Sequence, residues 1–137
     1  ELNKQIEEGK RERIRSIVES IEPTLTEEDG IVLIARQADF LPDIVKGIAF
    51  GLKPKFPNLV FVIGSAVGGK PALTVMLGDE IVSRGVDASK VVREAAKEIS
   101  GGGGGQPFYA TAGGKDAAGI EKAIFRAVEL IKTQLKR

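Results

Sequence analysis

Two short, uninterrupted apolar runs place the strongest constraint on the fold of this 137-residue chain. Ile31–Ala35 and Leu59–Ile63 contain no polar residue, which is typical of strands buried on both faces of a sheet. Between them, Asp39 and Pro42 mark the start of a helix whose apolar face extends to Leu52. A strand, a helix and a strand within about 35 residues predict a βαβ unit with parallel strands.

The sheet is expected to continue with a strand of opposite direction. Gly68-Gly69 is a turn signal, and the apolar run Ala72–Leu77 follows it, so this run is predicted to return antiparallel. Another helix is predicted to begin at Asp87 or Ser89, which are both good capping residues, and to end near Ile99.

Amphipathic helices are expected at both ends of the chain. Residues 1–22 carry apolar residues near one stripe, and Pro23 opposes continuation of the helix. Residues 116–135 show the same spacing. We expect a helical part over 1–28 and a globular part over 29–137. The predicted fold class is α/β: an N-terminal helical part, then a small mixed-sheet globular part with a glycine-rich loop before the last helix.

Composition excludes several kinds of site. The chain has no Cys and no His, so it offers no thiolate nucleophile, no Ser-His-Asp triad and no zinc finger. No apolar run reaches the roughly 18 residues of a membrane span, and the charged N-terminal segment is not a signal peptide. We therefore expect a cytoplasmic protein without contact to a membrane. Because the chain opens with Glu1 and its only Met is Met76, we expect a piece of a longer protein whose catalytic centre lies elsewhere.

The segment Gly64–Lys70 matches a phosphate-binding loop in part. It has the pattern G-x-x-x-x-G-K, but Pro71 stands where a Ser or Thr would hold Mg²⁺. Such a loop must also open a helix, whereas a strand-like run follows here. A hairpin turn with Lys70 exposed at its tip is therefore favoured over a nucleotide-hydrolase site.

The glycine run that begins at Gly101 allows two interpretations. Amide groups without side chains can approach a phosphate or a sugar closely, whereas composition alone favours a flexible hinge. The Phe108-Tyr109 pair and the Gly113-Gly114 pair, which leads into a helix, are typical of an ordered loop. The two aromatic rings either pack this loop down or stack on nucleobases.

The stretch 101–114, with the sequence GGGGGQPFYATAGG, resembles the glycine-rich signature of the C-terminal domain of alanyl-tRNA synthetases, in its archaeal version. The resemblance extends through Leu73–Val92 and both terminal helices, and so over essentially the whole chain. A related domain of DHH phosphoesterases shares this fold but carries a Gly-Gly-Gly-His signature. This chain has Gln106 in place of that His.

The resemblance implies a non-catalytic domain of a ligase. The parent enzyme would attach alanine to tRNA(Ala) with ATP and would remove mischarged amino acids at a zinc-dependent editing site. Both centres would lie in other parts of the enzyme, and no cofactor is expected in this segment. In the family the domain contributes to dimerisation and holds the outer corner of the tRNA. The alternative is the substrate-binding domain of a DHH-type phosphoesterase that acts on nucleic acid.

With a net charge of only +1, RNA binding must rely on local charge and shape. The candidate RNA contacts are Lys70, Gly101, Gly102, Gly103, Gly104, Gly105, Gln106 and Lys115, with Lys53 and Lys55 as outer contacts. The candidate dimer interface is the apolar stripe of the first helix, Ile6, Ile14, Ile17, Val18 and Ile21. The alternative for this stripe is that it packs on the sheet of its own chain or on an upstream partner helix.

Overall fold

A six-stranded mixed sheet forms the centre of the molecule in a computed structural model that describes residues 2–28, 30–40 and 42–135. The strand order is β1-β2-β3-β4-β6-β5. The strands are β1 (Glu27–Glu28), β2 (Ile31–Gln37), β3 (Leu59–Val67), β4 (Lys70–Leu77), β5 (Gly102–Gly105) and β6 (Tyr109–Gly113). Neighbours β2 and β3 are parallel, and the remaining neighbours are antiparallel. The predicted mixed sheet is confirmed.

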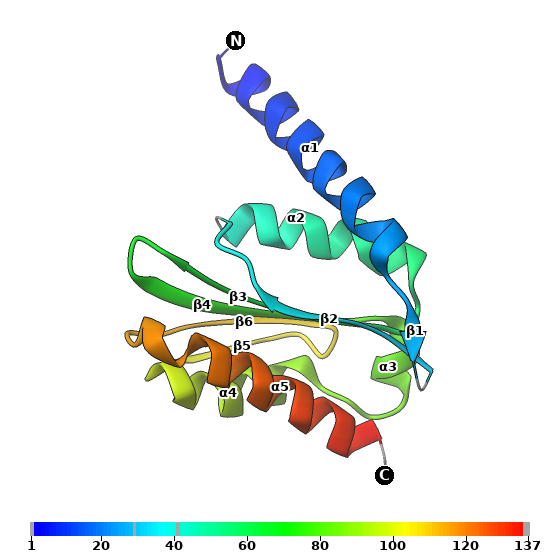
Figure 1. Ribbon diagram of the computed structural model, residues 1–137, viewed down its shortest axis with the longest axis vertical. Helices are drawn as coiled ribbons and strands as arrows, with labels where there is room; N and C mark the ends of the chain where they lie inside the picture. The colour runs from blue at the N-terminus through cyan, green and yellow to red at the C-terminus, as the bar shows by residue number, and fades with distance from the viewer. Residues whose placement is uncertain (1, 29, 41, 136–137) are drawn as a thin grey trace.

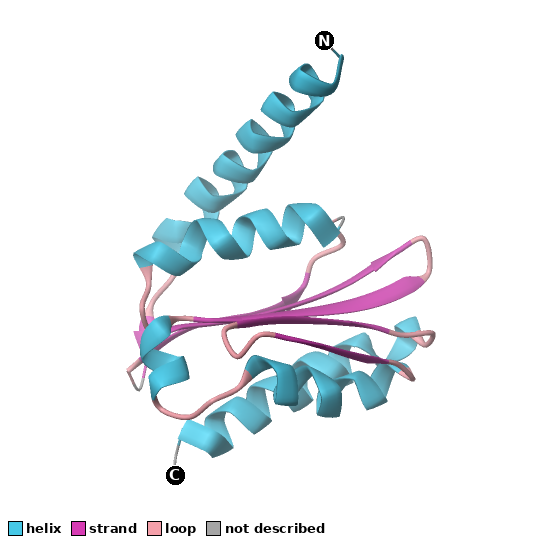
Figure 2. Cartoon of the chain, turned by 180° about the vertical axis from the view of Figure 1, so that it is seen from behind, coloured by secondary structure: helices cyan, strands magenta, loops and turns pink. Residues whose placement is uncertain are grey.

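Helices cover both faces of this sheet. α1 and α2 lie on one side, and α4 and α5 lie on the other (Figures 1 and 2). The helices are α1 (Leu2–Ile21), α2 (Pro42–Leu52), α3 (Asp79–Ser83), α4 (Ala88–Ala95) and α5 (Ile120–Leu135). Short 3-10 segments occupy Glu22–Thr24, Lys53–Lys55, Ala96–Ile99 and Ala117–Gly119. Among the described residues, no helix combines the length and the apolar character needed to cross a membrane.

The βαβ unit and the hairpin after it are confirmed. β2 pairs in parallel with β3, and Val32 lies opposite Leu59. β3 returns as β4 through a turn in which Gly68 and Gly69 both have left-handed backbone angles, φ 63° and 75°. This is the conformation that a two-residue hairpin turn requires and that glycine adopts without strain. Lys70 therefore begins a strand and not a helix, as expected for a hairpin turn.

Alternation along β3 explains why its sequence is apolar without interruption. Phe61 belongs to a core cluster beneath α2, together with Leu52 and Met76. Val60 and Val62 belong to a second cluster beneath α4 and α5. Because successive side chains point to opposite faces, a strand between two helical layers must be apolar at every position.

Two aspartates fix the ends of helices and loops. Asp87 is the N-cap of α4 and accepts a hydrogen bond from the Ser89 amide at 2.9 Å, which confirms one of the two predicted caps. α2 begins at Pro42 as predicted. Asp39 instead links two strands of the sheet, because its carboxylate accepts hydrogen bonds from the Gln37 side chain at 3.0 Å and from the Ala66 amide at 2.9 Å. These two donors lower the pKa of Asp39.

The C-terminal half of α1 packs on α2 over two glycines. A Cβ atom at Gly47 would overlap Cδ1 of Ile14, and a Cβ at Gly51 would lie 3.1 Å from Cγ2 of Val18. Gly47 and Gly51 are one helical turn apart, as are Ile14 and Val18, so two successive turns of each helix are in contact. The absence of side chains on α2 therefore allows α1 to lie close against it.

The glycine run departs from the expected loop. Gly102–Gly105 forms β5, the last strand of the sheet, and pairs antiparallel with Tyr109–Gly113, which forms β6. A strand made only of glycine gives no alternation of apolar and polar residues, so its sequence carries no strand signal. The segment expected as a glycine-rich loop is thus a two-stranded hairpin, and its strand β5 forms one edge of the sheet.

Candidate nucleic-acid interface

Lys70 and Lys115 lie along one open groove. The groove has a volume of about 600 Å³ and is lined by Gly69, Lys70, Pro71, Ser100, Gly101, Gly113, Gly114 and Lys115. β4 and β6 bring these distant segments together, because Ala72 lies opposite Gly113. Pairing continues past the strand end, where the Gly114 amide donates to the Pro71 carbonyl at 3.1 Å. Two lysines 45 positions apart in sequence thereby share a surface with glycine backbone.

The groove ends at the N-terminal side of α5. The amides of Lys115 and Asp116 donate to the Ile99 carbonyl at 2.8 and 3.0 Å. The Asp116 carboxylate accepts from the Ala118 amide at 3.1 Å and caps the 3-10 turn that precedes α5. The backbone that carries Lys115 is therefore held at several points, while the Lys115 side chain is exposed.

Two predicted RNA contacts, Gln106 and Lys53, lie at the other end of β4 and β6. Gln106 precedes the β5–β6 turn and exchanges two backbone hydrogen bonds with Tyr109, at 2.8 and 3.3 Å. Lys53 forms an ion pair with Asp79 at 2.9 Å, and its ammonium group lies 5.2 Å from the centre of the Phe108 ring. Because Tyr109 pairs with Met76, this corner is separated from Lys70 by almost the full length of β4.

Lys55 belongs to a different surface. Its ammonium group forms an ion pair with Glu22 at 2.8 Å, and the residue lines a groove of about 330 Å³ between α1 and α2. Arg11 and Arg15 line the same groove. The structure thus brings Lys70, Gly101 and Lys115 together and leaves Gln106, Lys53 and Lys55 apart from them.

The aromatic residues beside the glycine run pack onto the protein. Phe108 and Tyr109 are half-buried against the core cluster beneath α2. The Tyr109 ring lies 5.1 Å from the ring of Phe50, and burial raises the pKa of its phenol. The side chain of Phe50 is 40% exposed. The sequence did not identify it as a neighbour of Tyr109, because its spacing is that of an ordinary apolar position on a helix.

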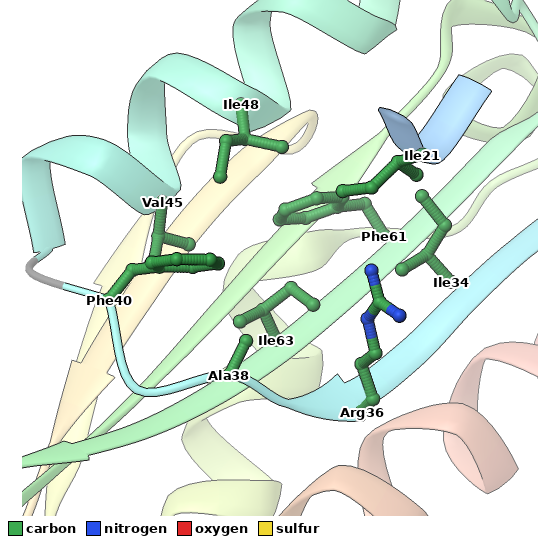
Figure 3. A pocket seen from close by; sticks show the side chains of 9 residues that line it. All are labelled: Ile21, Ile34, Arg36, Ala38, Phe40, Val45, Ile48, Phe61 and Ile63. Carbon is green, nitrogen blue, oxygen red and sulfur yellow. The ribbon is translucent and has the colours of Figure 1, made fainter. Parts of the chain in front are cut away.

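The apolar stripe of α1 is largely engaged within the chain. Val18 and Ile21 are buried, and Ile14 and Ile17 are partly buried against the same cluster. The side chain of Ile6 lies outside the described part of the chain. Figure 3 shows Ile21 beside Phe61 at a small apolar cavity beneath α2. This cavity has a volume of only about 10 Å³, which is too small for a ligand, so it belongs to the core.

Among the residues that the structure describes, no three or more carboxylates gather where they could hold a metal ion. The sequence itself supplies no His and no Cys. The residues of this chain therefore do not fit the zinc site that an editing enzyme would need.

Comparison with known proteins finds alanine–tRNA ligases among the relatives of this chain. An alanine–tRNA ligase of Bacteroides thetaiotaomicron is 46% identical over 130 residues, 94% of this chain and 15% of the relative. An alanine–tRNA ligase of Cytophaga hutchinsonii is 42% identical over 134 residues, 96% of this chain and 15% of the relative. The chain thus spans about 15% of the length of these relatives. Both organisms are bacteria, so they lend no support to an archaeal version of the glycine signature.

Two solved structures share the fold. The C-Ala domain from Aquifex aeolicus alanyl-tRNA synthetase aligns with a TM-score of 0.64 at 28% identity, over 82% of this chain and 98% of that domain. A DHH domain described as a member of the s1p family of ribosomal proteins aligns with a TM-score of 0.58 over 91% of this chain and 31% of that one. At 16% identity the second likeness concerns the fold alone.

The model of the DHHA1 domain family matches residues 29–136, which include the whole sheet except β1 and all of α2 to α5. This match, the two ligases and the C-Ala structure agree with the resemblance seen in the glycine signature. The chain belongs to the DHHA1 domain family.

Proposed function

We propose that this chain is the C-terminal, tRNA-binding domain of an alanine–tRNA ligase. The proposal rests above all on one observation: a domain similar to the C-Ala domain holds Lys70 and Lys115 at one open groove beside exposed glycine backbone. Two cations flanking uncharged backbone suit a sugar–phosphate chain, which needs charge neutralisation and close approach. We infer that this groove contacts the outer corner of tRNA(Ala).

The chain itself would be non-catalytic within this enzyme. ATP-dependent attachment of alanine and zinc-dependent removal of wrong amino acids would take place in other parts of the ligase, and the enzyme would act in the cytoplasm. The DHH-type phosphoesterase alternative is supported by likeness of fold alone. Gln106 stands where that class has a histidine, which disfavours the alternative.

Binding of an unmodified tRNA(Ala) transcript to this chain tests the proposal. With about four phosphate contacts, the logarithm of the affinity should fall with the logarithm of salt concentration at a slope of about −3. The double variant Lys70→Glu and Lys115→Glu should bind much more weakly, and its slope should be shallower by about 1.5 to 2.

A control double variant with the same change in net charge distinguishes the loss of a contact at the groove from a general electrostatic effect on RNA binding. Lys122→Glu and Lys132→Glu change the net charge equally on the exposed side of α5 and should leave binding nearly unchanged. Equal loss in both double variants would show that the groove is not the contact surface. Absence of salt-dependent RNA binding by the unaltered chain would overturn the proposed function.

Self-association through α1 is the second part of the proposal. The N-terminal half of α1 extends away from the body of the molecule (Figure 1), whereas its C-terminal half is engaged by α2. Ile6 lies in the extending half. We expect a dimer in sedimentation at micromolar concentration and a monomer for Ile6→Asp, with Gly9→Ala as the control in the same half. A monomer of the unaltered chain, or a dimer indifferent to Ile6→Asp, would contradict this part.

A further inference from the structure

We propose that Phe50 of α2 and Tyr109 of β6 form a stacking site for a nucleobase of bound RNA, with Lys46 beside them as the cation for the adjoining phosphate. The inference rests on the proposed RNA-binding function and adds a base contact to it. This site lies at the opposite end of β4 and β6 from the groove that holds Lys70 and Lys115.

Phe50 differs from its neighbours on α2 because its ring is not covered. Its side chain is 40% exposed, whereas Ala49 and Leu52 are fully buried. The rings of Phe50 and Tyr109 have centres 5.1 Å apart and are tilted by 57° to each other. Tyr109 is half-buried and packs on the core cluster beneath α2. Tyr109 therefore holds the Phe50 ring in place while part of that ring stays available to a flat partner.

The face of β6 next to these two rings is open. Successive side chains of a strand point to opposite faces of a sheet. Ala110 and Ala112 belong to the core cluster beneath α4 and α5, whereas Tyr109 packs beneath α2. Thr111 therefore lies on the same face as Tyr109, and it is exposed. The sheet surface beyond Tyr109 is thus accessible to a ligand.

The same face of the sheet leads to Lys70. On β4, the alternation places Lys70 and Thr74 on the face of Met76, which packs beneath α2. Met76 lies opposite Tyr109, and Thr74 lies opposite Thr111. Six residues at about 3.4 Å each separate Lys70 from Met76 by about 20 Å along the strand. A nucleic acid strand held at Lys70 would therefore reach the two rings by crossing this one face.

Two lysines lie beside the aromatic rings. The ammonium group of Lys46 lies 6.0 Å from the centre of the Phe50 ring, and that of Lys53 lies 5.2 Å from the centre of the Phe108 ring. Lys53 is engaged by an ion pair with Asp79, so the exposed Lys46 is the cation that we assign to the phosphate. A base stacked on Phe50 would bring its own phosphate near this ammonium group.

The surroundings favour a nucleobase over an apolar side chain of another protein molecule. Cations next to aromatic rings are complementary to a strand in which flat bases alternate with phosphates. The Thr111 side chain offers a hydroxyl to polar groups of RNA. An apolar contact between copies would instead take this hydroxyl and the Lys46 ammonium group out of water without a partner.

A fluorescence titration tests the stacking directly. The chain has no Trp, so Phe50→Trp introduces a single reporter and keeps a flat ring at this position. Its fluorescence should be quenched by an unmodified tRNA(Ala) transcript and by single-stranded oligoadenylate, because a base stacks on the new ring. Inorganic polyphosphate, which carries charge but no bases, should leave the fluorescence unchanged.

Binding measurements distinguish a stacking ring from a merely apolar residue. Phe50→Ala should weaken binding of the tRNA transcript about tenfold without changing the slope of its salt dependence, since no phosphate contact is lost. Phe50→Leu keeps apolar surface but no flat ring, and should lose nearly as much. Lys46→Gln should weaken binding and make the slope shallower by about 1. Phe125→Ala is the matched control, because it removes a 71% exposed ring from α5.

The outcomes separate this inference from the function on which it rests. RNA binding that depends on Lys70 and Lys115 but is unchanged in Phe50→Ala would overturn the inference and keep the proposed function. Fluorescence of Phe50→Trp that changes with protein concentration in the absence of RNA would identify a contact between copies and would also overturn the inference. Absence of any RNA binding by the unaltered chain would overturn both.

Discussion

Ile14 of α1 lies so close to Gly47 of α2 that a methyl group at position 47 would overlap the Cδ1 atom of Ile14. One helical turn further on, Val18 has the same relationship to Gly51 at a longer distance. The direction of α1 is therefore set by contacts with α2, and the stripe expected from the sequence as a dimer interface is used largely within the chain.

Gly47→Ala should leave the chain less stable than Gly9→Ala does by about 1 kcal/mol, because the added methyl group must displace Cδ1 of Ile14, whereas both substitutions gain the helix propensity of alanine. Urea unfolding at neutral pH measures this. Ile14→Val removes Cδ1 and should restore part of the lost stability in the double variant. Gly9→Ala is the control, since a Cβ at Gly9 meets no atom within 4 Å. Equal changes in the free energy of unfolding for Gly47→Ala and Gly9→Ala would mean that α1 is not held against α2 at this position.

Tyr109 offers a direct measure of burial at the start of β6, because it is the only tyrosine in the chain. Its pKa is raised above the ordinary 10.0 by desolvation. Titration of the near-ultraviolet absorbance of the folded chain should place ionisation above pH 10.0. Phe50→Ala uncovers the ring and should move the pKa toward 10.0, whereas Phe125→Ala, at a 71% exposed position, should not.

The sign of the coupling to stability follows from the same shift. Because the folded-state pKa of Tyr109 is raised, its contribution is fully present below the unfolded pKa and is lost as the pH rises through the folded pKa. The loss of stability between neutral and alkaline pH should therefore be smaller in Phe50→Ala, in which the pKa of Tyr109 lies closer to 10.0. An equal loss in both proteins, each measured from its own stability at neutral pH, would be the contrary result.

Asp87→Ala should cost about 1 kcal/mol, because it leaves the Ser89 amide at the start of α4 without its acceptor. Asp87→Asn keeps an oxygen acceptor and should retain most of that stability. Glu98→Ala, an exposed position near the end of the same helical segment, should change the free energy by less than about 0.5 kcal/mol. If Asp87→Ala and Glu98→Ala have equal effects, the cap does not contribute.

Asp39→Ala should destabilise the chain at neutral pH by removing the acceptor of the Gln37 side chain and the Ala66 amide. The folded-state pKa of Asp39 is lowered, so its contribution is present above the unfolded pKa and is lost as the pH falls through the folded pKa. The difference from the unaltered chain should persist above pH 3.8, the ordinary value, and shrink below it. Glu12→Ala, exposed on α1, is the control.

Elements with a strong local signal were predictable from the sequence. The apolar runs of β2 and β3, the Gly68-Gly69 turn and the Asp87 cap each depend on residues close together in the chain. Lys70 and Lys115 were predicted on one surface because each lies beside a glycine pair. The register of β4 with β6 brings both residues to the same groove.

What depends on distant backbone could not be predicted. The strand β5 has no side chains from which to read a period, and only its pairing with β6 identifies it. Gln106 ends up far from Lys70 because the β5–β6 turn lies at the opposite end of the sheet from the β3–β4 turn. The close contact of α1 with Gly47 and Gly51 can be recognised only when the positions of both helices are known.

The geometry of the sheet itself requires glycine at several positions of the run 101–105, independently of any ligand. A side chain at Gly101, Gly103 or Gly105 would strike the backbone of β6 or its flank, whereas one at Gly102 would meet nothing. A sequence search keyed to the glycine run therefore detects this hairpin, whatever the domain binds. Under the proposed function, RNA binding by a relative is expected to depend on cations at the positions of Lys70 and Lys115 and not on the glycine run alone.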